Sequence, residues 1–300
     1  MGILFAGIVI SFIVILIINI IFFSINIVFW AFNGLQSILL EMNFVERIHA
    51  SILFKWILFL DFAWFVMSIG YFLKRKHFKT NSDLYYLKEN LITNPKIFVI
   101  IPSFNEEDAI EKVVNDFKHQ KYVNNILVVD NNSSDKTVEL AKKSGAQVIK
   151  KSMNKGYAHS CVMGFQEALK TNDDLIVLAE SDDTFSAFDI EKMIPYLSNC
   201  DMVVGTRQVQ ALTEKGNQLG MYHVWGNLIL AKLIQLKYFS LLHMGVVQLT
   251  DVGCSYRCIR KNSLKKIINK FTQNESNEIV TDAQGGLFAL FMTILAIEND

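Results

Sequence analysis

Three carboxylates follow one short apolar run, and their spacing predicts a metal site. The segment "LIVLAESDDTF", residues 175–185, begins like a buried strand and then places Glu180, Asp182 and Asp183 close together. Like charges a few ångströms apart repel, so one carboxyl group would keep its proton unless a cation lies among them. Carboxylate oxygens are ligands that suit Mg²⁺ and Mn²⁺. We therefore expect a divalent metal at this point of the chain.

The elements that would position these carboxylates alternate along residues 96–300. Short apolar runs predict strands at 97–101, 126–129, 146–149, 175–179 and 202–205. Capping residues and helical periodicity predict helices after an N-cap at Asn105 and over about 134–144, 157–170 and 188–197. Strands that alternate with helices predict an α/β fold with a mostly parallel, Rossmann-like sheet covered on both faces. Ligands bind such sheets beyond the carboxyl ends of the strands, where the strand order reverses.

Two other strand ends carry polar residues that would meet the carboxylates at this edge. The first strand is followed by "PSFNEE", residues 102–107, and the second ends at Asp130 in "VVDNNSSDKT". Neither a dinucleotide fingerprint nor a P-loop glycine pattern follows the first strand. Carboxylates in that loop would repel phosphate. We expect them to hydrogen-bond a base or ribose, while the metal holds a nucleotide diphosphate.

The N-terminal part predicts a membrane anchor. Residues 3–32 form an uncharged apolar run longer than the roughly 20 residues that cross a bilayer. A second run, residues 56–73, contains Asp61, which would cost about 3 kcal/mol near the membrane centre. Either Asp61 has a polar partner on the first helix, or this segment lies partly in the interface. The basic segment "KRKHFK", residues 74–79, would remain cytoplasmic.

These segments divide the chain into an anchor over residues 1–79 with two spans, a linker over 80–95 and a cytoplasmic domain over 96–300. The formal net charge is zero, and no basic stripe with aromatic residues is present, which excludes nucleic acid as a partner.

The cysteine spacing lacks the second ligand pair of a zinc site, so we expect reduced structural thiols.

Several motifs occur in an order that resembles family 2 glycosyltransferases. They are "FVIIPSFNEEDAI", "ILVVDNNSSDKT", "NKGYAHSCVMGFQEAL", "IVLAESDDTFS", "MVVGTRQ" and "DVGCSYRCIRK". The resemblance covers roughly residues 96–262 and is strongest to the branch with dolichyl-phosphate mannose synthase and other polyprenyl-phosphate glycosyltransferases. It implies the glycosyltransferase A fold and an inverting hexosyltransferase with a UDP- or GDP-linked sugar donor.

The same resemblance implies roles for individual residues. The donor would contact Pro102, Phe104, Glu106, Asp130, Lys155, Gly156 and Ser181. The metal motif of the family, usually Asp-x-Asp, is Glu180-Ser181-Asp182 here, so one arm is longer by a methylene and the metal ligands would be Glu180 and Asp182. Catalytic roles would fall to Asp182, Arg207 and Asp251. The acceptor would contact Arg207 and Arg257. Asp183 would be either an outer partner of the metal ligands or a helix cap.

The acceptor stays open between two chemistries. A polyprenyl phosphate is already an anion and needs no general base, whereas a sugar hydroxyl would need one, with Asp251 or Asp183 as candidates. We predict a membrane-anchored glycosyltransferase that depends on Mg²⁺ or Mn²⁺ and acts on a lipid phosphate. The alternatives are a transferase that acts on a sugar hydroxyl in polysaccharide or glycolipid synthesis, and a non-catalytic membrane protein that binds nucleotide sugars.

The C-terminal segment "GGLFALFMTILAI", residues 285–297, is too short to span a membrane and predicts a buried helix. The family commonly continues into a further strand and a basic loop. We therefore expect either a C-terminally incomplete domain or a domain that lacks part of its acceptor site.

Overall fold

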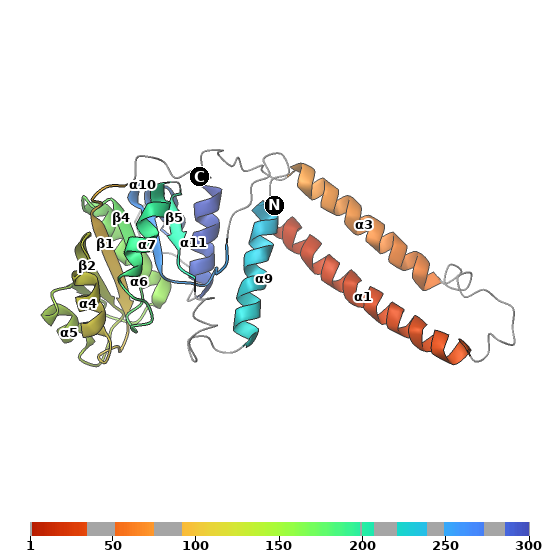
Figure 1. The fold of residues 1–300 in the computed structure, drawn as a ribbon, viewed down its shortest axis with the longest axis horizontal. Coiled ribbons are helices and arrows are strands. Elements are labelled where there is room, and N and C mark those ends of the chain that lie inside the picture. Colours follow the sequence, from red (N-terminus) through yellow and green to blue (C-terminus); the bar gives the residue numbers. More distant parts are fainter. Residues whose placement is uncertain are drawn as a thin grey trace. The chain divides into compact units, whose positions relative to one another are not determined.

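The computed structural model describes residues 2–34, 52–74, 92–198, 200–206, 221–238, 249–272 and 286–299. The chain divides into two compact units, Met1–Phe78 and Lys79–Asp300 (Figure 1). The expected linker lies outside the described residues as far as residue 91, and the expected basic flank lies outside them beyond Lys74.

The described part of the N-terminal unit contains two long apolar helices, α1 (Gly2–Gly34) and α3 (Ile52–Lys74). Segments within them, Gly7–Ile25 and Lys55–Lys74, are long and apolar enough to cross a membrane, judged by length and composition. The helices are joined by polar contacts: Asn19 donates from Nδ2 to Asp61 at 3.4 Å, and Trp64 donates from Nε1 to the carbonyl of Ile8 at 3.1 Å. Asp61 thus has a polar partner on the first helix, the first of the two alternatives.

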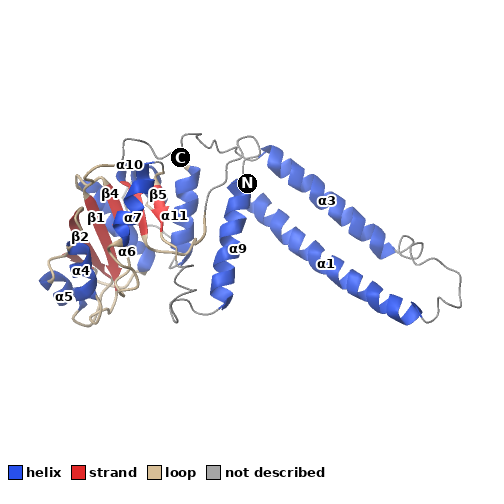
Figure 2. Cartoon of the chain, viewed as in Figure 1, coloured by secondary structure: helices blue, strands red, loops and turns tan. Residues whose placement is uncertain are grey.

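The described part of the second unit contains a six-stranded sheet (Figure 2). Its strands are β1 (Ile97–Ser103), β2 (Val123–Asp130), β3 (Gln147–Lys150), β4 (Leu175–Leu178), β5 (Met202–Val204) and β6 (Arg257–Arg260). They lie in the order β3-β2-β1-β4-β6-β5, with β1 to β4 parallel and β6 antiparallel to both of its neighbours. The strand order reverses between β1 and β4. This mostly parallel sheet confirms the predicted fold class.

Helices cover both faces of the sheet. The described helices of this unit are α4 (Ile110–Lys118), α5 (Thr137–Lys143), α6 (Tyr157–Lys170), α7 (Asp189–Met193), α9 (Met221–Tyr238), α10 (Lys261–Ile267) and α11 (Gly286–Glu298), with 3₁₀ turns η2 (Ile194–Ser198) and η3 (Ile268–Lys270). Apolar residues of α4, α5 and α7 pack on one face, and those of α6, α10 and α11 pack on the other. The core therefore consists of two layers separated by the sheet.

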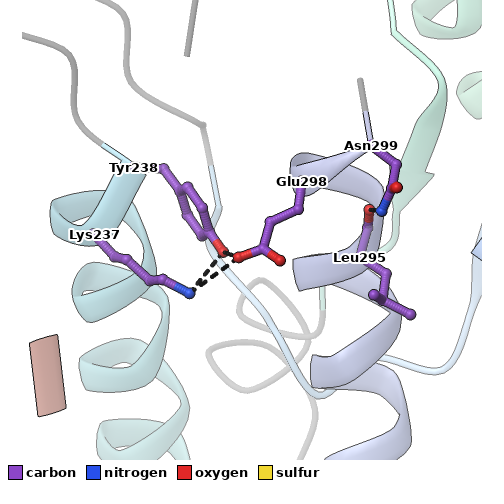
Figure 3. A network of polar contacts seen from close by, with 5 residues as sticks. All are labelled: Lys237, Tyr238, Leu295, Glu298 and Asn299. Atoms are coloured by element: carbon purple, nitrogen blue, oxygen red, sulfur yellow. Dashed lines mark hydrogen bonds and ion pairs between the residues drawn. The ribbon is translucent and has the colours of Figure 1, made fainter. Parts of the chain in front are cut away.

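The C-terminal helix α11 packs one of its faces into the second layer, which confirms the predicted buried helix. Phe288 and Met292 are fully buried there, and the Phe288 ring lies 6.5 Å from the ring of Phe165 on α6. Figure 3 shows how the end of α11 meets α9: Tyr238 donates to Glu298 at 2.6 Å, and Lys237 lies 3.3 Å from the same carboxylate. These contacts fix α9 beside α11.

Two expected helix starts are wrong. Asn105 is not an N-cap, because α4 begins only at Ile110, after Ala109. Asn105 has a φ of +55°, and its side chain accepts a hydrogen bond from the backbone of Ser134 at 2.9 Å instead. Similarly, α5 begins at Thr137 rather than near residue 134. In both cases polar residues between the strand and the helix form a turn, so the helix begins later than expected.

The contact of α6 with β1 provides a test of the packing. A Cβ atom on Gly164 would lie 2.3 Å from Cγ2 of Ile100. Gly164→Ala should therefore lower the free energy of unfolding by about 1–3 kcal/mol, as overpacked core sites do. Thermal unfolding of the detergent-solubilised chain measures this. The control is Gly226→Ala on α9, where an added Cβ meets no atom within 4 Å and alanine favours a helix. Equal losses in both variants would contradict the prediction.

Candidate active site

The loops at the carboxyl edge of the sheet share an unusual backbone conformation. In the described part of the chain, β1 to β4 are each followed by a residue with positive φ: Asn105 (+55°), Asn132 (+70°), Gly156 (+85°) and Asp183 (+63°). Residues other than glycine rarely adopt this conformation, although Asn and Asp tolerate it best. Such backbone positions are common at functional sites. The four turns therefore mark this edge as the candidate active site.

Hydrogen bonds tie the first two loops together. The backbone N–H of Asn105 donates to Ser133 Oγ at 2.9 Å, and that of Glu106 donates to Thr137 Oγ1 at 2.8 Å. In return, the N–H of Lys136 donates to the Glu107 carboxylate at 3.0 Å. The loops after β1 and β2 therefore form one unit that fixes the backbone of Glu106.

Two asparagines tie the third loop to the second. Asn131 Oδ1 accepts the N–H of Lys155 at 3.0 Å, and its Nδ2 donates to Asn154 Oδ1 at 2.5 Å. Asn154 Oδ1 also accepts the N–H of Gly156 at 2.9 Å. This clamp fixes the chain where α6 begins. Sequence reasoning missed both asparagines because Asn is common in turns, and its partner across a loop is not visible in the sequence.

The structure brings the predicted carboxylates together. Glu180 is half-buried and accepts a hydrogen bond from Ser255 Oγ at 2.5 Å. Asp182 is exposed and accepts the N–H of Thr184 at 3.0 Å. Burial and then the negative charges of several carboxylates, with Asp182 the strongest and Glu180 among them, raise the pKa of Glu106. The edge thus concentrates negative charge, as the sequence predicts.

The metal chemistry of this edge is limited to few protein ligands. Among the described residues, no group of three or more His, Cys, Asp or Glu side chains is arranged to hold a metal ion. Mg²⁺ commonly takes one or two carboxylates and completes its shell with water and substrate phosphate oxygens. The pair Glu180 and Asp182 fits that mode. The four cysteines, Cys161, Cys200, Cys254 and Cys258, all lie in described residues and are free in the structure.

Asp183 has a partner that the sequence did not indicate. Its carboxylate forms an ion pair with Lys112 on α4. The helix-cap alternative is wrong, since the next helix, α7, begins only at Asp189. The positive φ of Asp183 instead directs the chain into a turn, and the ion pair stabilises that turn.

The donor-binding candidates lie at the same edge with different exposure. Pro102 and Ser181 are buried, whereas Phe104 is 45% exposed. Asp130 is fully buried, and its carboxylate accepts hydrogen bonds from the backbone N–H of Ser133 at 3.0 Å and from the Ser133 hydroxyl. In this structure Asp130 therefore stabilises its own turn. Its contact with a base or ribose stays a prediction.

The acceptor candidates are buried or lie outside the described residues. Arg207 belongs to the residues that the structure does not describe. Asp251 is 2% exposed and accepts hydrogen bonds from Asn227 Nδ2 and, at 3.0 Å, from the N–H of Gly253. These bonds join the segment before β6 to α9.

Arg257 is fully buried, so the structure does not bring its guanidinium to the surface. It donates to the carbonyls of Cys254 at 2.8 Å and Val252 at 3.0 Å, and to Thr293 Oγ1 on α11 at 2.8 Å. Burial lowers the pKa of Arg257 to about 10. The contact of Arg257 with an acceptor stays a prediction, and its visible role is to hold the segment before β6 against α11.

A second lysine near the N-terminus of α6 escaped sequence reasoning. Lys155, the expected ligand of the donor, is exposed, but Lys151 is only 7% exposed. Its Nζ donates to Ser160 Oγ at 2.9 Å and lies 3.5 Å from Nδ1 of His159. Burial and then the charge of Lys155 lower the pKa of Lys151 to about 8. Two adjacent lysines after a strand give no signal that one of them is buried.

Residues 98–280, more than half of the chain, match the family model described as "Glycosyl transferase family 2". The chain belongs to glycosyl transferase family 2. This confirms the predicted family, its glycosyltransferase A-type α/β fold and an activity as a hexosyltransferase.

Known relatives place the chain among archaeal and bacterial proteins of this family. An uncharacterised protein of Methanocaldococcus jannaschii is 33% identical over 195 residues, which cover 63% of this chain and 73% of the relative. The UDP-N-acetylglucosamine–dolichyl-phosphate N-acetylglucosaminyltransferase of Methanococcus voltae is 27% identical, with 56% and 71% covered. The polyprenol monophosphomannose synthase of Mycolicibacterium smegmatis is 24% identical, with 68% and 73% covered. The family 2 chain thus resembles enzymes of the predicted branch.

The buried lysine predicts a pH dependence. The folded-state pKa of Lys151, about 8, lies below its usual value of 10.5, so between these pH values the unfolded chain binds more protons. The contribution of Lys151 to stability therefore rises as the pH increases through this window. Lys151→Met removes the buried charge, so its gain in Tm over the wild type should be largest below pH 8 and shrink toward pH 10.5. A difference in Tm between Lys151→Met and the wild type that does not change with pH would contradict this prediction. Lys142→Met is the control, because Lys142 is exposed.

The asparagine clamp predicts an effect on donor binding. Asn131→Ala removes both bonds to the third loop, and at about 1 kcal/mol for each net bond it should weaken binding of the donor nucleotide by about five- to thirty-fold. Isothermal titration calorimetry with UDP and with GDP measures the dissociation constants. Asn124→Ala is the matched control, because Asn124 Nδ2 donates to Asp173 at 3.1 Å at the opposite edge of the sheet. Nucleotide binding that Asn131→Ala leaves at the wild-type level would refute the clamp.

Proposed function

We propose that this family 2 glycosyltransferase moves a hexosyl group from a nucleotide-sugar donor to a polyprenyl-phosphate-type lipid at a membrane. The observation that carries this proposal is the gathering of Glu106, Glu180 and Asp182 at the carboxyl edge of the sheet, after the paired strands β1 and β4. Burial and then the negative charges of neighbouring carboxylates, Asp182 and Glu180 among them, raise the pKa of Glu106, and this concentration of carboxylates favours a divalent cation, Mg²⁺ or Mn²⁺.

On the donor side, Glu180 and Asp182 would hold the cation that binds the diphosphate of a UDP- or GDP-linked sugar. When bound, this cation neutralises the charge that develops on the leaving nucleoside diphosphate. Asp182 is suited to this role because it is exposed and one of its oxygens is fixed by the N–H of Thr184. The clamped loop at Lys155 and Gly156 presents the N-terminus of α6, where backbone N–H groups favour anions. Phe104 and Asp130 contact the nucleoside, and attack from the opposite side of the sugar inverts the anomeric carbon.

On the acceptor side, the engaged carboxylates support an acceptor that is already an anion. Both candidate bases for a hydroxyl acceptor have partners: Asp183 pairs with Lys112, and Asp251 is buried and hydrogen-bonded to Asn227. A phosphate nucleophile needs no base, only cations, and Arg207 is the candidate for that role. The named relatives from Methanococcus voltae and Mycolicibacterium smegmatis carry dolichyl phosphate and polyprenol monophosphomannose in their names, which supports a lipid phosphate as the acceptor.

A lipid acceptor requires an enzyme near the membrane. The apolar helices α1 and α3 supply such an anchor in this proposal, with both spans crossing the bilayer. The basic residues from Lys74 to 79 keep the catalytic domain on the cytoplasmic side. Nucleotide sugars and lipid phosphates then meet at one surface.

The proposal is tested by transfer of label into lipid. Detergent-solubilised chain is incubated with Mg²⁺ or Mn²⁺, labelled UDP- or GDP-sugars and undecaprenyl or dolichyl phosphate, and the mixture is extracted with organic solvent. We expect metal-dependent label in the organic phase and a loss of at least about a hundredfold in Asp182→Ala, comparable to the loss of one preorganised charge-stabilising group. Asp189→Asn is the control, because Asp189 pairs with Lys192 on the surface of α7.

Two outcomes would count against the proposal. If a donor binds but the label stays in the aqueous phase for every donor, a lipid-phosphate acceptor is excluded. The remaining functions would be transfer to a sugar hydroxyl or nucleotide-sugar binding without catalysis. Transfer that Asp182→Ala retains would show that the carboxylate pair is not the metal site.

A further inference from the structure

The hydroxyl of Ser255 lies close to the carboxylate edge although it belongs to a different part of the chain. Ser255 Oγ donates to Oε1 of Glu180 at 2.5 Å. This distance is typical of a strong hydrogen bond between a hydroxyl and a carboxylate. Ser255 is 6% exposed, so water competes little for this bond. The segment before β6 is thus joined directly to the end of β4.

The backbone around Ser255 is fixed on both sides. On one side, the carbonyl of Cys254 accepts a hydrogen bond from Arg257 at 2.8 Å. On the other side, the hydroxyl of Tyr256 donates to the carbonyl of Ser186 at 3.2 Å, and the Tyr256 carbonyl accepts the N–H of Gly205 at 2.9 Å. A hydroxyl on such a rigid segment can orient a carboxylate without losing much further conformational freedom.

The bond also gives a reason for the length of the side chain at position 180. Position 180 carries Glu, whose arm is longer by one methylene than that of Asp. In the structure that longer arm reaches Ser255, which engages one of the two carboxylate oxygens. A shorter Asp at position 180 would not keep the same bond. Partners of this kind orient metal-binding side chains and affect metal affinity.

We propose that Ser255 is a positioning residue for the metal site. Its hydroxyl fixes Oε1 of Glu180 so that the second oxygen faces the cation beside Asp182. This inference rests on the proposed function, because it concerns the cation held by Glu180 and Asp182.

The test measures metal binding without turnover. Mn²⁺ is titrated into detergent-solubilised full-length chain with UDP, and separately with GDP, and free Mn²⁺ is followed by electron paramagnetic resonance. Ser255→Ala should weaken nucleotide-dependent Mn²⁺ binding by about tenfold, the lower end of the effect of such partners. Ser255→Thr retains a hydroxyl and should restore most of the affinity. Ser186→Ala is the control, since Ser186 is exposed and its contact with Tyr256 uses only its carbonyl.

Glu180→Asp tests the same bond from its other end and keeps Ser255 in place. It should weaken Mn²⁺ binding to a similar extent, and the double variant Glu180→Asp/Ser255→Ala should lose little more than either single variant, because both remove one interaction. This second variant keeps the test valid if Ser255→Ala unfolds the domain.

The outcomes separate this inference from the proposed function. In one outcome, the wild type binds Mn²⁺ in a nucleotide-dependent way and a folded Ser255→Ala or Glu180→Asp variant binds it equally well. That result would overturn the role of Ser255 and leave the proposed metal site standing. A wild type without nucleotide-dependent Mn²⁺ binding would overturn the proposed metal site, and this inference with it.

Discussion

Repulsion among carboxylates is the constraint on which the arrangement of the catalytic edge depends. Glu106, Glu180 and Asp182 come from two neighbouring parallel strands, so the sheet itself forces their charges together. Burial and then the charges of the neighbouring carboxylates raise the pKa of Glu106, so folding this edge without a cation costs free energy. The chain tolerates that cost because the backbone of each loop is fixed by hydrogen bonds, and a bound cation would then recover it as binding energy.

The polar loops show how this rigidity arises without regular secondary structure. Asn105 and Asn131 each accept a backbone N–H from another loop, and each belongs to a turn with a positive φ at or next to it. Short amide side chains suit this role because they tolerate left-handed backbone nearby and offer both a donor and an acceptor. The cost of the strained turns is thus offset by bonds between loops, and the site is preorganised before any ligand arrives.

The sequence predicts the elements better than the contacts. Parallel strands with long apolar runs and the helix from Tyr157 to Lys170 were predicted at or near their observed bounds, because periodicity is a local property. The strand from Arg257 to Arg260 was missed, since it is short and alternates charged with apolar residues. The partner of Asp183, the burial of Lys151 and the bond of Ser255 were missed for another reason: each depends on residues or packing from a different element.

The engagement of carboxylates also bears on how one site can serve a charged acceptor. Asp251 and Asp183 both have partners: Asp251 accepts a hydrogen bond from Asn227 on α9, and Asp183 forms an ion pair with Lys112. The positive charge of Lys112 offsets the negative charge of Asp183, and under the proposed function this reduces the repulsion of a phosphate acceptor. The carboxylates Glu106, Glu180 and Asp182 concentrate negative charge that favours a metal, whereas Asp183 and Asp251 are engaged by neighbouring residues. Under the proposed function, this difference suits a reaction between two phosphate-bearing substrates.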